Sequence, residues 1–343
     1  PMKIKMVDVA KRLGISKATV SLAVNGKPGV NEQTRQKVLE CIKELEKNNG
    51  VFPEPLNSPE KEAHRRMIKV LIINHRRRVV CDPELDLWTD VLHTFDTEAR
   101  KRGYLYGLSY INETEDETNA VIDECNMPLV AGIIVFATEM QTTDYPILEK
   151  IQKPMVLYDH ETPDGKYNSI CIDNETAVRS CLDLLHQSGV SNIKYLCTGK
   201  NIYNFQKRRE AFRNALIAQD HMPAKNDIIE LGYTIPAITE QMLAWLDHNA
   251  LPEGFLFENY QVSIGVITAL RKRGIKFPER IKVIGIDEIP DYIFPASKLT
   301  QIRIPHAERA AIAMELLDKE ISQQWKTRIK IYAQPEVIPG KSL

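Results

Sequence analysis

The sequence has 343 residues, of which 43% are hydrophobic and 27% charged, and its formal net charge is −1. This composition is typical of a soluble globular protein, and the length leaves room for more than one domain. No run approaches eighteen apolar residues, no apolar export signal stands at the N-terminus, and the six cysteines form no CxxC pair. We therefore expect a cytoplasmic protein without membrane spans, disulfides, metal sites or cofactors.

Two short helices joined by a tight turn are predicted near the N-terminus. Gly14, which tolerates a positive φ, ends a first helix near Leu13, and Ser16 can cap a second helix. This is the pattern of a helix-turn-helix. Spacing of i, i+4 on the second helix predicts that Val20 and Val24 pack inward. The opposite stripe is free to contact DNA and consists of Lys17, Ala18, Ser21 and Leu22.

A third helix is expected after Asn31, which can cap it, and Val38, Ile42 and Leu45 would complete a three-helix core. Residues 1–50 carry 10 Lys and Arg against 5 Asp and Glu, a net charge of +5, so residues 51–343 total −6. A basic segment on an acidic body is typical of a phosphate-binding module. A small helical subdomain with a solvated basic face is the alternative.

Residues 51–67 are predicted to be a linker or hinge, because Pro53, Pro55 and Pro59 lie within seven residues and a charged run follows them.

From residue 68 onward, short apolar runs rich in Val and Ile alternate with amphipathic stretches. The runs are 70–73, 105–111, 132–136, 155–158, 193–196, 254–257 and 282–286. Helices are predicted at roughly 86–102, 114–126, 175–188, 205–219, 236–249, 260–273 and 306–324. Continuous apolar strands separated by helices predict an α/β body with parallel, doubly wound sheets.

A body of this kind could belong to a Rossmann-type enzyme. However, the sequence has no GxGxxG after a strand, no Walker lysine and no GxSxG elbow. Polar residues instead follow four predicted strands directly, namely His75, Asp159, Asn259 and Asp287. Ligands of doubly wound sheets bind at the carboxyl ends of the strands, so these side chains are expected to converge on one cleft.

Five motifs near the N-terminus carry a family resemblance: Val7-Asp8-Val9-Ala10, Gly14-Ile15-Ser16, Ala18-Thr19-Val20-Ser21, Val24-Asn25-Gly26 and Val30-Asn31-x-x-Thr34-Arg35. Through them, residues 4–47 resemble the DNA-binding headpiece of the LacI/GalR family of bacterial repressors. The resemblance implies a sequence-specific transcriptional regulator bound to double-stranded operator DNA. It places Lys17, Ala18, Ser21 and Leu22 at base edges, and Leu22 offers a thymine methyl contact only. Further expected DNA contacts are Lys5, Ser16, Thr19, Asn25 and Asn31, the last three of these on phosphates.

Relatives carry a hinge helix with an Ala-x-x-Leu motif before the body. The linker here lacks that motif, so a hinge helix and a flexible tether remain alternatives, with Leu56 as the one candidate wedge for the minor groove.

The body resembles the two-lobed, periplasmic-binding-protein-like effector domain of the same family. The matching segments are Asp173-Asn174-Glu175-x-Ala177, Arg208-Arg209-Glu210-Ala211-Phe212, Phe257-Glu258-Asn259, Val283-Ile284-Gly285-Ile286-Asp287 and Leu299-Thr300-Gln301-Ile302-x-Ile304-Pro305. The resemblance implies that Arg208, Asn259 and Asp287 bind a sugar or a sugar derivative. Trp88 either stacks on its ring or packs in the core of the helix at 86–102.

Tyr260 stands where relatives usually have Asp, and Arg76 to Arg78 follow His75. A phosphorylated or acidic sugar and a nucleoside-like ligand are therefore alternatives to a neutral sugar, unless the arginines form a solvated loop. We also expect Asp159, His75 and Tyr260 to be effector-binding residues.

The lobes are expected at approximately 68–172 with 303–329, and 173–302 with 330–343. Three chain crossings join them, near 172–173, 302–305 and 328–331. No leucine heptads follow the last helix, so a homodimer is expected. The effector would set the inter-lobe angle and thereby the spacing of the two headpieces on DNA. A solute-binding receptor without a transcriptional role is the alternative.

Overall fold

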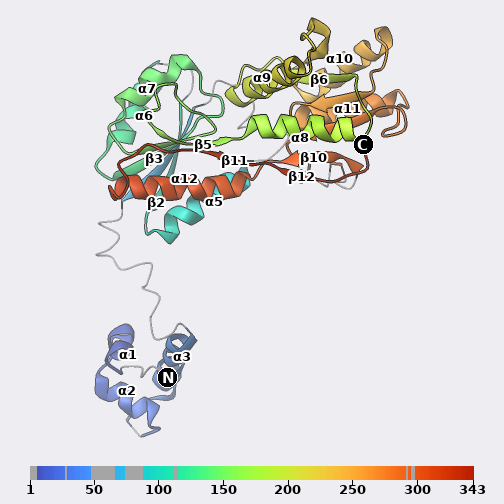
Figure 1. Cartoon of the computed structure of the whole chain (residues 1–343). Coiled ribbons are helices and arrows are strands. Elements are labelled where there is room, and N and C mark those ends of the chain that lie inside the picture. Colours follow the sequence, from blue (N-terminus) through green and yellow to red (C-terminus); the bar gives the residue numbers. More distant parts are fainter. Residues whose placement is uncertain are drawn as a thin grey trace. The chain divides into compact units, whose positions relative to one another are not determined.

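A computed structural model gives the structure of the chain and describes residues 6–27, 29–47, 66–73, 88–111, 115–290, 293–294 and 298–343. The chain divides into two compact units, a headpiece at 1–64 and a body at 65–343, which are treated separately below (Figure 1). Residues 51–65 of the predicted linker, which include Leu56, lie outside the described residues, as do Lys5 and His75 to Arg78. The linker was predicted to extend to residue 67, but Met67 already belongs to the first strand of the body. No helix among the described residues has both the length and the apolar character that a membrane crossing requires.

The headpiece contains three helices, α1 (Met6–Leu13), α2 (Lys17–Val24) and α3 (Glu32–Lys47). Gly14 has φ +64° between the first two, a conformation that costs glycine little. The Ser16 hydroxyl accepts a hydrogen bond from the Thr19 backbone N–H at 3.0 Å, and the Asn31 side chain accepts one from Thr34 N–H at 2.7 Å. The predicted helix-turn-helix is thereby confirmed, as are the predicted caps of α2 and α3.

The headpiece core consists of Val9, Ala10, Val20, Ala23, Val38 and Cys41. One part of the predicted packing is wrong, because Val24 is 38% exposed whereas Ala23 is buried. The inward stripe of α2 continues from Val20 at i+3 rather than at i+4, and both spacings place residues on one helical face.

Lobe 1 of the body is a six-stranded parallel sheet in the order β11-β5-β4-β3-β1-β2. Its strands are β1 (Met67–Ile73), β2 (Leu105–Ile111), β3 (Val130–Phe136), β4 (Met155–Tyr158), β5 (Asn168–Ile172) and β11 (Lys330–Ala333). Two helices, α5 (Thr89–Lys101) and α12 (His306–Ile321), cover one face, and α6 (Glu115–Asn126) and α7 (Tyr145–Lys150) cover the other (Figure 1). A Cβ on Gly132 of β3 would lie 2.9 Å from Leu317, so glycine allows α12 to approach this closely.

Lobe 2 has a second six-stranded sheet in the order β12-β10-β9-β8-β6-β7, parallel except for β12. Its strands are β6 (Ile193–Thr198), β7 (Ile228–Leu231), β8 (Gly254–Phe257), β9 (Lys282–Ile286), β10 (Thr300–Arg303) and β12 (Glu336–Ile338). Helices α8 (Asn174–Gln187) and α9 (Tyr203–Ala218) cover one face, and α10 (Ile235–His248) and α11 (Tyr260–Lys272) cover the other. The α/β class with parallel, doubly wound sheets is confirmed.

The chain crosses between the lobes after β5, after β10 and after β11. The first two crossings lie where they were expected. The third was expected near 328–331, which would put the whole of 330–343 in lobe 2. This is wrong, because Lys330 to Ala333 pair with β5 in lobe 1, and only β12 and the residues after it join lobe 2.

Candidate functional site

A cavity of about 360 Å³ lies between the two lobes of the body. Lobe 1 contributes residues after β3 and β4 and at the starts of α5 and α12, namely Trp88, Asp90, Thr138, Asp159, His306, Ala307 and Glu308. Lobe 2 contributes Ile202, Asn204, Phe205, Arg208, Asn259, Tyr260, Asp287 and Glu288, and the crossing segments contribute Ile172, Arg303, Ile304 and Pro305. The volume suits a small molecule, and both lobes can contact one ligand.

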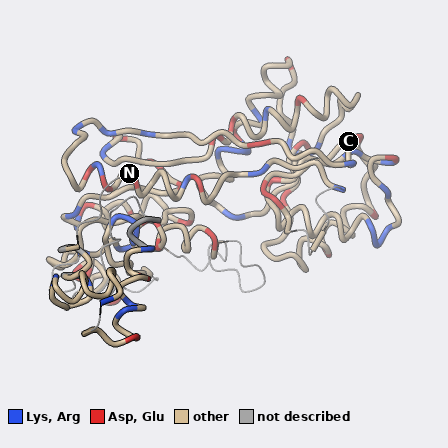
Figure 2. The backbone as a smooth tube through the Cα atoms, turned by 90° about the horizontal axis from the view of Figure 1, so that it is seen from below, with Lys and Arg blue, Asp and Glu red and all other residues tan. Residues whose placement is uncertain are grey.

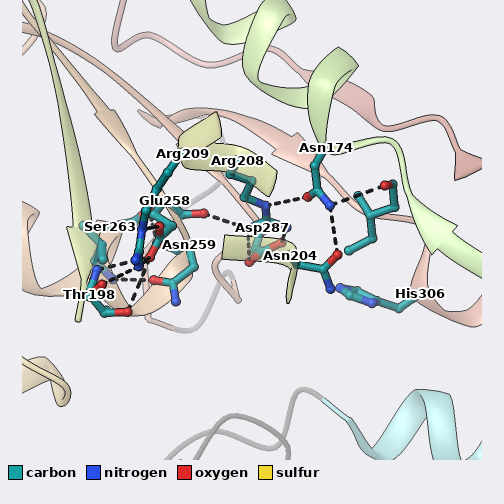
Figure 3. Close-up of polar contacts among 12 residues, drawn as sticks. Asn174, Thr198, Asn204, Arg208, Arg209, Glu258, Asn259, Ser263, Asp287 and His306 are labelled. Carbon is teal, nitrogen blue, oxygen red and sulfur yellow. Dashed lines mark hydrogen bonds and ion pairs between the residues drawn. The ribbon is translucent and has the colours of Figure 1, made fainter. Parts of the chain in front are cut away.

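Arg208 is buried on α9 and pairs with Asp287 in two parallel hydrogen bonds. Its Nη1 and Nη2 each donate to a different oxygen of the Asp287 carboxylate at 3.1 Å. Nη1 also donates to the Glu258 carbonyl at 2.7 Å, and Nε donates to Asn174 Oδ1 at 2.9 Å (Figure 3). At least four of its five N–H groups are therefore engaged within the protein. Burial by itself would lower the pKa of Arg208, but Asp287 raises it above its ordinary value.

A second set of polar contacts holds Glu258 and Asn174, the other two residues to which Arg208 donates. Arg209 Nε donates to the fully buried Glu258 carboxylate at 2.7 Å, and Thr198 N–H donates to the same carboxylate at 3.1 Å (Figure 3). Asn174 Nδ2 donates to Asn204 Oδ1 at 2.9 Å. The Asn204 oxygen is thus occupied within the protein, and its amide NH₂ group is left to face the cavity.

Asp159 has a corresponding place in lobe 1. It follows β4 directly, is 1% exposed, and accepts hydrogen bonds from Arg309 Nη2 and from the Thr138 hydroxyl at 2.7 Å. Burial opposes its ionisation, but Arg309, His306 and Thr138 together lower the pKa of Asp159 below its ordinary value. Arg309 is itself fully buried and lies over the Tyr158 ring at 4.4 Å.

Asn259 and Tyr260 line the cavity at the start of α11. The Asn259 side-chain oxygen caps that helix by accepting from Val262 N–H at 2.9 Å, so its amide NH₂ group remains available to a ligand. Tyr260 is 6% exposed and packs in the core of lobe 2. The bulky phenol therefore lies mainly within the protein.

Aromatic rings form the apolar side of the cavity. The Trp88 ring lies edge-to-face with Phe136 at 5.1 Å and with His306 at 5.0 Å, and it packs against Ile202 and Phe205 of lobe 2. The predicted core packing of Trp88 is thus present, and its ring also lines the cavity, where the predicted stacking on an effector ring stays a prediction. Burial is the main cause that lowers the pKa of His306 to about 4, and Arg309 adds to it, so the imidazole is neutral at pH 7. Its Nδ1 lies 3.4 Å from Arg309 Nη1 and accepts from it, which leaves Nε2–H to donate a hydrogen bond.

Six of the seven predicted effector residues line this one cavity: Trp88, Asp159, Arg208, Asn259, Tyr260 and Asp287. The seventh, His75, lies outside the described residues. Sequence reasoning missed Asn204 and His306. Asn204 stands four residues before Arg208, a spacing that places both on one face of α9 and could have identified it. His306 directly follows the second crossing, and no spacing or motif in the sequence marked it as a cavity residue.

The predicted DNA-contacting stripe lies on α2 of the headpiece. Lys17 and Ala18 are exposed, whereas Ser21 and Leu22 are half-buried. Ser16 and Thr19 share a 2.8 Å hydroxyl contact, and Asn25 Nδ2 donates to the Ser21 carbonyl at 2.8 Å, so these polar groups also stabilise the ends of the helix. The described headpiece has more Lys and Arg than Asp and Glu, whereas both signs of charge are interspersed over the body (Figure 2).

Comparisons with known proteins match the chain in both units. A family model described as bacterial regulatory proteins, lacI family, matches residues 5–46, and a periplasmic binding protein-like domain matches residues 182–343. Catabolite control protein A of Priestia megaterium is 25% identical over 327 residues, which is 94% of each chain. The transcriptional repressor CytR of Escherichia coli K12 is 24% identical and covers 93% of this chain and 90% of its own.

Solved structures share the fold across the full length. A transcriptional regulator CelR–cellobiose complex superimposes with a TM-score of 0.69 at 18% identity, covering 99% of this chain and 100% of that one. A Lac repressor dimer bound to operator and the anti-inducer ONPF gives a TM-score of 0.67 at 18% identity, covering 99% of each chain.

Proposed function

Because this chain belongs to the LacI/GalR family of bacterial transcriptional regulators, we propose that it acts as a homodimeric repressor whose affinity for operator DNA is controlled by a small molecule in the inter-lobe cavity. Two headpieces of one dimer would occupy the two halves of a pseudo-palindromic operator. A ligand that favours one inter-lobe angle would change the spacing of the headpieces and hence the affinity.

The observation that carries this proposal is the combination of two features in one chain. The headpiece exposes Lys17 and Ala18 on a capped second helix, and the body has a cavity lined by polar groups from both lobes. A ligand that bridges the lobes has different contacts at different lobe angles, which is the requirement for allosteric control.

We propose further that the effector is an uncharged ring that carries several hydroxyl groups. Asn204, Asn259 and the neutral His306 offer hydrogen bonds to hydroxyls, and Asp287 retains acceptor capacity beside Arg208. Trp88 and Phe205 supply the apolar contacts that the faces of a sugar or nucleoside ring require.

The surroundings of Arg208 count against an anionic effector. Its guanidinium is already paired with Asp287, so a phosphate or carboxylate would have to displace an internal ion pair. Asp90, Glu288 and Glu308 also line the cavity and add negative charge, whereas the remaining basic lining residue, Arg303, is paired with Glu336. Hydroxyl groups meet no such repulsion.

Selection of bound sequences from a random DNA library by the full-length protein tests the DNA-binding proposal. We expect a pseudo-palindromic site, and we expect Lys17→Ala to weaken its binding by about tenfold, since a base contact is worth roughly 1–3 kcal/mol. Lys43→Ala is the matched control, an exposed lysine on α3 of the same headpiece, and should change binding little. Recovery of unrelated sequences would contradict the proposal.

A thermal-shift screen of hexoses, their phosphates and nucleosides tests the effector proposal. A ligand at 100 times its dissociation constant adds about 2.7 kcal/mol of apparent stability. We expect shifts from neutral sugars or nucleosides and none from the corresponding phosphates. A shift from a phosphate alone would show that the effector is anionic.

A further inference from the structure

The first turn of α9 contacts lobe 1 on two sides. On the cavity side, Phe205 and the preceding Ile202 pack against Trp88. On the side away from the cavity, the Tyr203 hydroxyl donates a hydrogen bond to Glu161, which lies three residues after the end of β4. One helical turn therefore touches both the effector cavity and a contact that joins the lobes elsewhere.

Glu161 accepts hydrogen bonds from two tyrosines that come from different lobes. Tyr203 of lobe 2 donates its hydroxyl to Oε1 at 2.8 Å. Tyr332 of β11, in lobe 1, donates to Oε2 at 2.7 Å, and Lys330 Nζ lies 2.9 Å from the same oxygen. Of these three bonds to Glu161, the one from Tyr203 crosses between the lobes.

Glu161 is held in its charged form. Burial would raise its pKa, but the hydrogen bonds from Tyr332, Lys330 and Tyr203 lower it below the ordinary value. A hydroxyl that donates to a carboxylate makes a stronger bond than one that donates to a neutral acceptor.

Two further contacts join this part of lobe 2 to lobe 1, one at the first turn of α9 and one at Asn201, which precedes the helix. The His160 ring lies 4.7 Å from the Tyr203 ring at an angle of 57°, and Gln141 Nε2 donates to the Asn201 carbonyl at 2.9 Å. The Tyr203 side chain is thus fixed by ring packing as well as by its hydroxyl. Rotation of one lobe against the other must separate these groups.

We propose that the Tyr203–Glu161 hydrogen bond is a latch that stabilises this arrangement of the lobes, so that Tyr203 controls effector affinity without contacting the effector. Tyr203 immediately precedes Asn204 and stands five residues before Arg208, both of which line the cavity. Movement of α9 away from Glu161 would carry these two side chains with it. The proposal rests on the proposed function only in its link to the effector.

Distance measurements between spin labels on the two lobes test the latch in full-length protein without any ligand. Labels are placed at Gln152→Cys in lobe 1 and Ala218→Cys in lobe 2, both exposed, in a Cys81→Ser background. Tyr203→Phe keeps the ring packing and removes the hydroxyl. Tyr332→Phe is the matched control, because it removes a hydroxyl from the same carboxylate within lobe 1.

We expect Tyr203→Phe to broaden and shift the distance distribution and Tyr332→Phe to leave it unchanged. Glu161→Gln, which weakens the acceptor, should change it in the same direction by a smaller amount. Unchanged distributions in all three variants, or equal changes in the two tyrosine variants, would overturn the latch. Because no ligand or DNA is present, this result is independent of the proposed function.

The link to the effector is tested with a compound found in the thermal-shift screen. If the effector binds the arrangement in which Tyr203 contacts Glu161, its apparent affinity is proportional to the fraction of the protein in that arrangement. We expect Tyr203→Phe to weaken binding by about tenfold, as for the loss of a hydrogen bond to a charged group, and Tyr332→Phe to leave it unchanged. An unaltered affinity for Tyr203→Phe beside a shifted distance distribution would overturn the role in effector binding alone.

Discussion

Asp159 and Asp287 hold matching positions in the two lobes: each directly follows a strand, each has a positive φ, 71° and 68°, and each pairs with an arginine that is almost fully buried. A residue other than glycine in this conformation costs of order 1–3 kcal/mol and persists only where its surroundings hold it. The two arginines, Arg309 and Arg208, provide that support. The cavity therefore has a paired carboxylate on each side.

We predict that Asp159→Ala lowers the free energy of unfolding by about 3–5 kcal/mol, because it leaves the Arg309 charge buried without its partner. Urea unfolding followed by circular dichroism measures this change. Asp123→Ala is the control, since Asp123 is an exposed aspartate on α6 of the same lobe and its removal should have little effect. Equal losses in the two variants would mean that the buried pair is not what stabilises lobe 1.

We predict that Arg208→Ala abolishes the response to the effector and leaves operator binding without effector intact. The substitution removes the donor that orients Asp287, while the headpiece is unchanged. Calorimetric titration with the effector, beside DNA-binding anisotropy, measures both properties. Arg213→Ala, at an exposed arginine of the same helix, should behave as the wild type. Effector affinities that are equal in the Arg208→Ala variant and the wild type would remove Arg208 from the site.

His160 is predicted to make stability depend on pH between about 6.5 and 4. Burial lowers its pKa to about 4, against the influence of Glu161, Asp159 and Asp144, while the unfolded chain binds the proton at its ordinary pKa of about 6.5. Its contribution is thus fully present above pH 6.5 and is lost as the pH falls, by up to about 3 kcal/mol.

Midpoints of urea unfolding measured from pH 7 to pH 4.5 test this. His160→Gln should reduce the slope, leaving the part due to His306, whose pKa is lowered in the same way. His248→Gln, at an exposed position, should keep the slope of the wild type. A slope that is the same in all three proteins would contradict the assignment to His160.

We predict that a fragment of residues 1–60 binds operator more weakly than the full chain and with a shallower dependence on salt. One headpiece neutralises fewer phosphates than two, and the slope of log affinity against log salt scales with that number. Anisotropy at several salt concentrations measures both quantities. A fragment that matches the full chain at physiological salt would show that the two headpieces do not act together.

Strong patterns in the sequence predicted the elements that the structure contains. The runs at 132–136 and 254–257 are buried strands, and the glycine turn at Gly14 is where it was expected. Strands β5, β7, β10, β11 and β12 were missed because they contain polar residues such as Asn168, Gln301 and Lys330. Their strand form depends on pairing with distant neighbours, which local composition does not indicate.

In the candidate site, too, some features could be predicted from the sequence and others could not. Position after a strand was sufficient to select Asp159, Asn259 and Asp287, since it follows from topology. It did not indicate that Arg208 is already paired with Asp287, because the two lie 79 residues apart in the chain. Arg208 was predicted to bind an effector, and it lines the cavity while also holding the Asp287 carboxylate.

The pairing of β11 with β5 determines when lobe 1 can complete its fold during synthesis of the chain. Lobe 1 needs α12 over its sheet and β11 at the edge beside β5, and both come near the C-terminus. A nascent chain that has completed the strands of lobe 1 up to Ile172 still exposes the apolar face that α12 will cover, until nearly all of lobe 2 has left the ribosome. Premature termination after β10 would therefore leave an incomplete first lobe prone to aggregation, even though most of the second lobe would already be present.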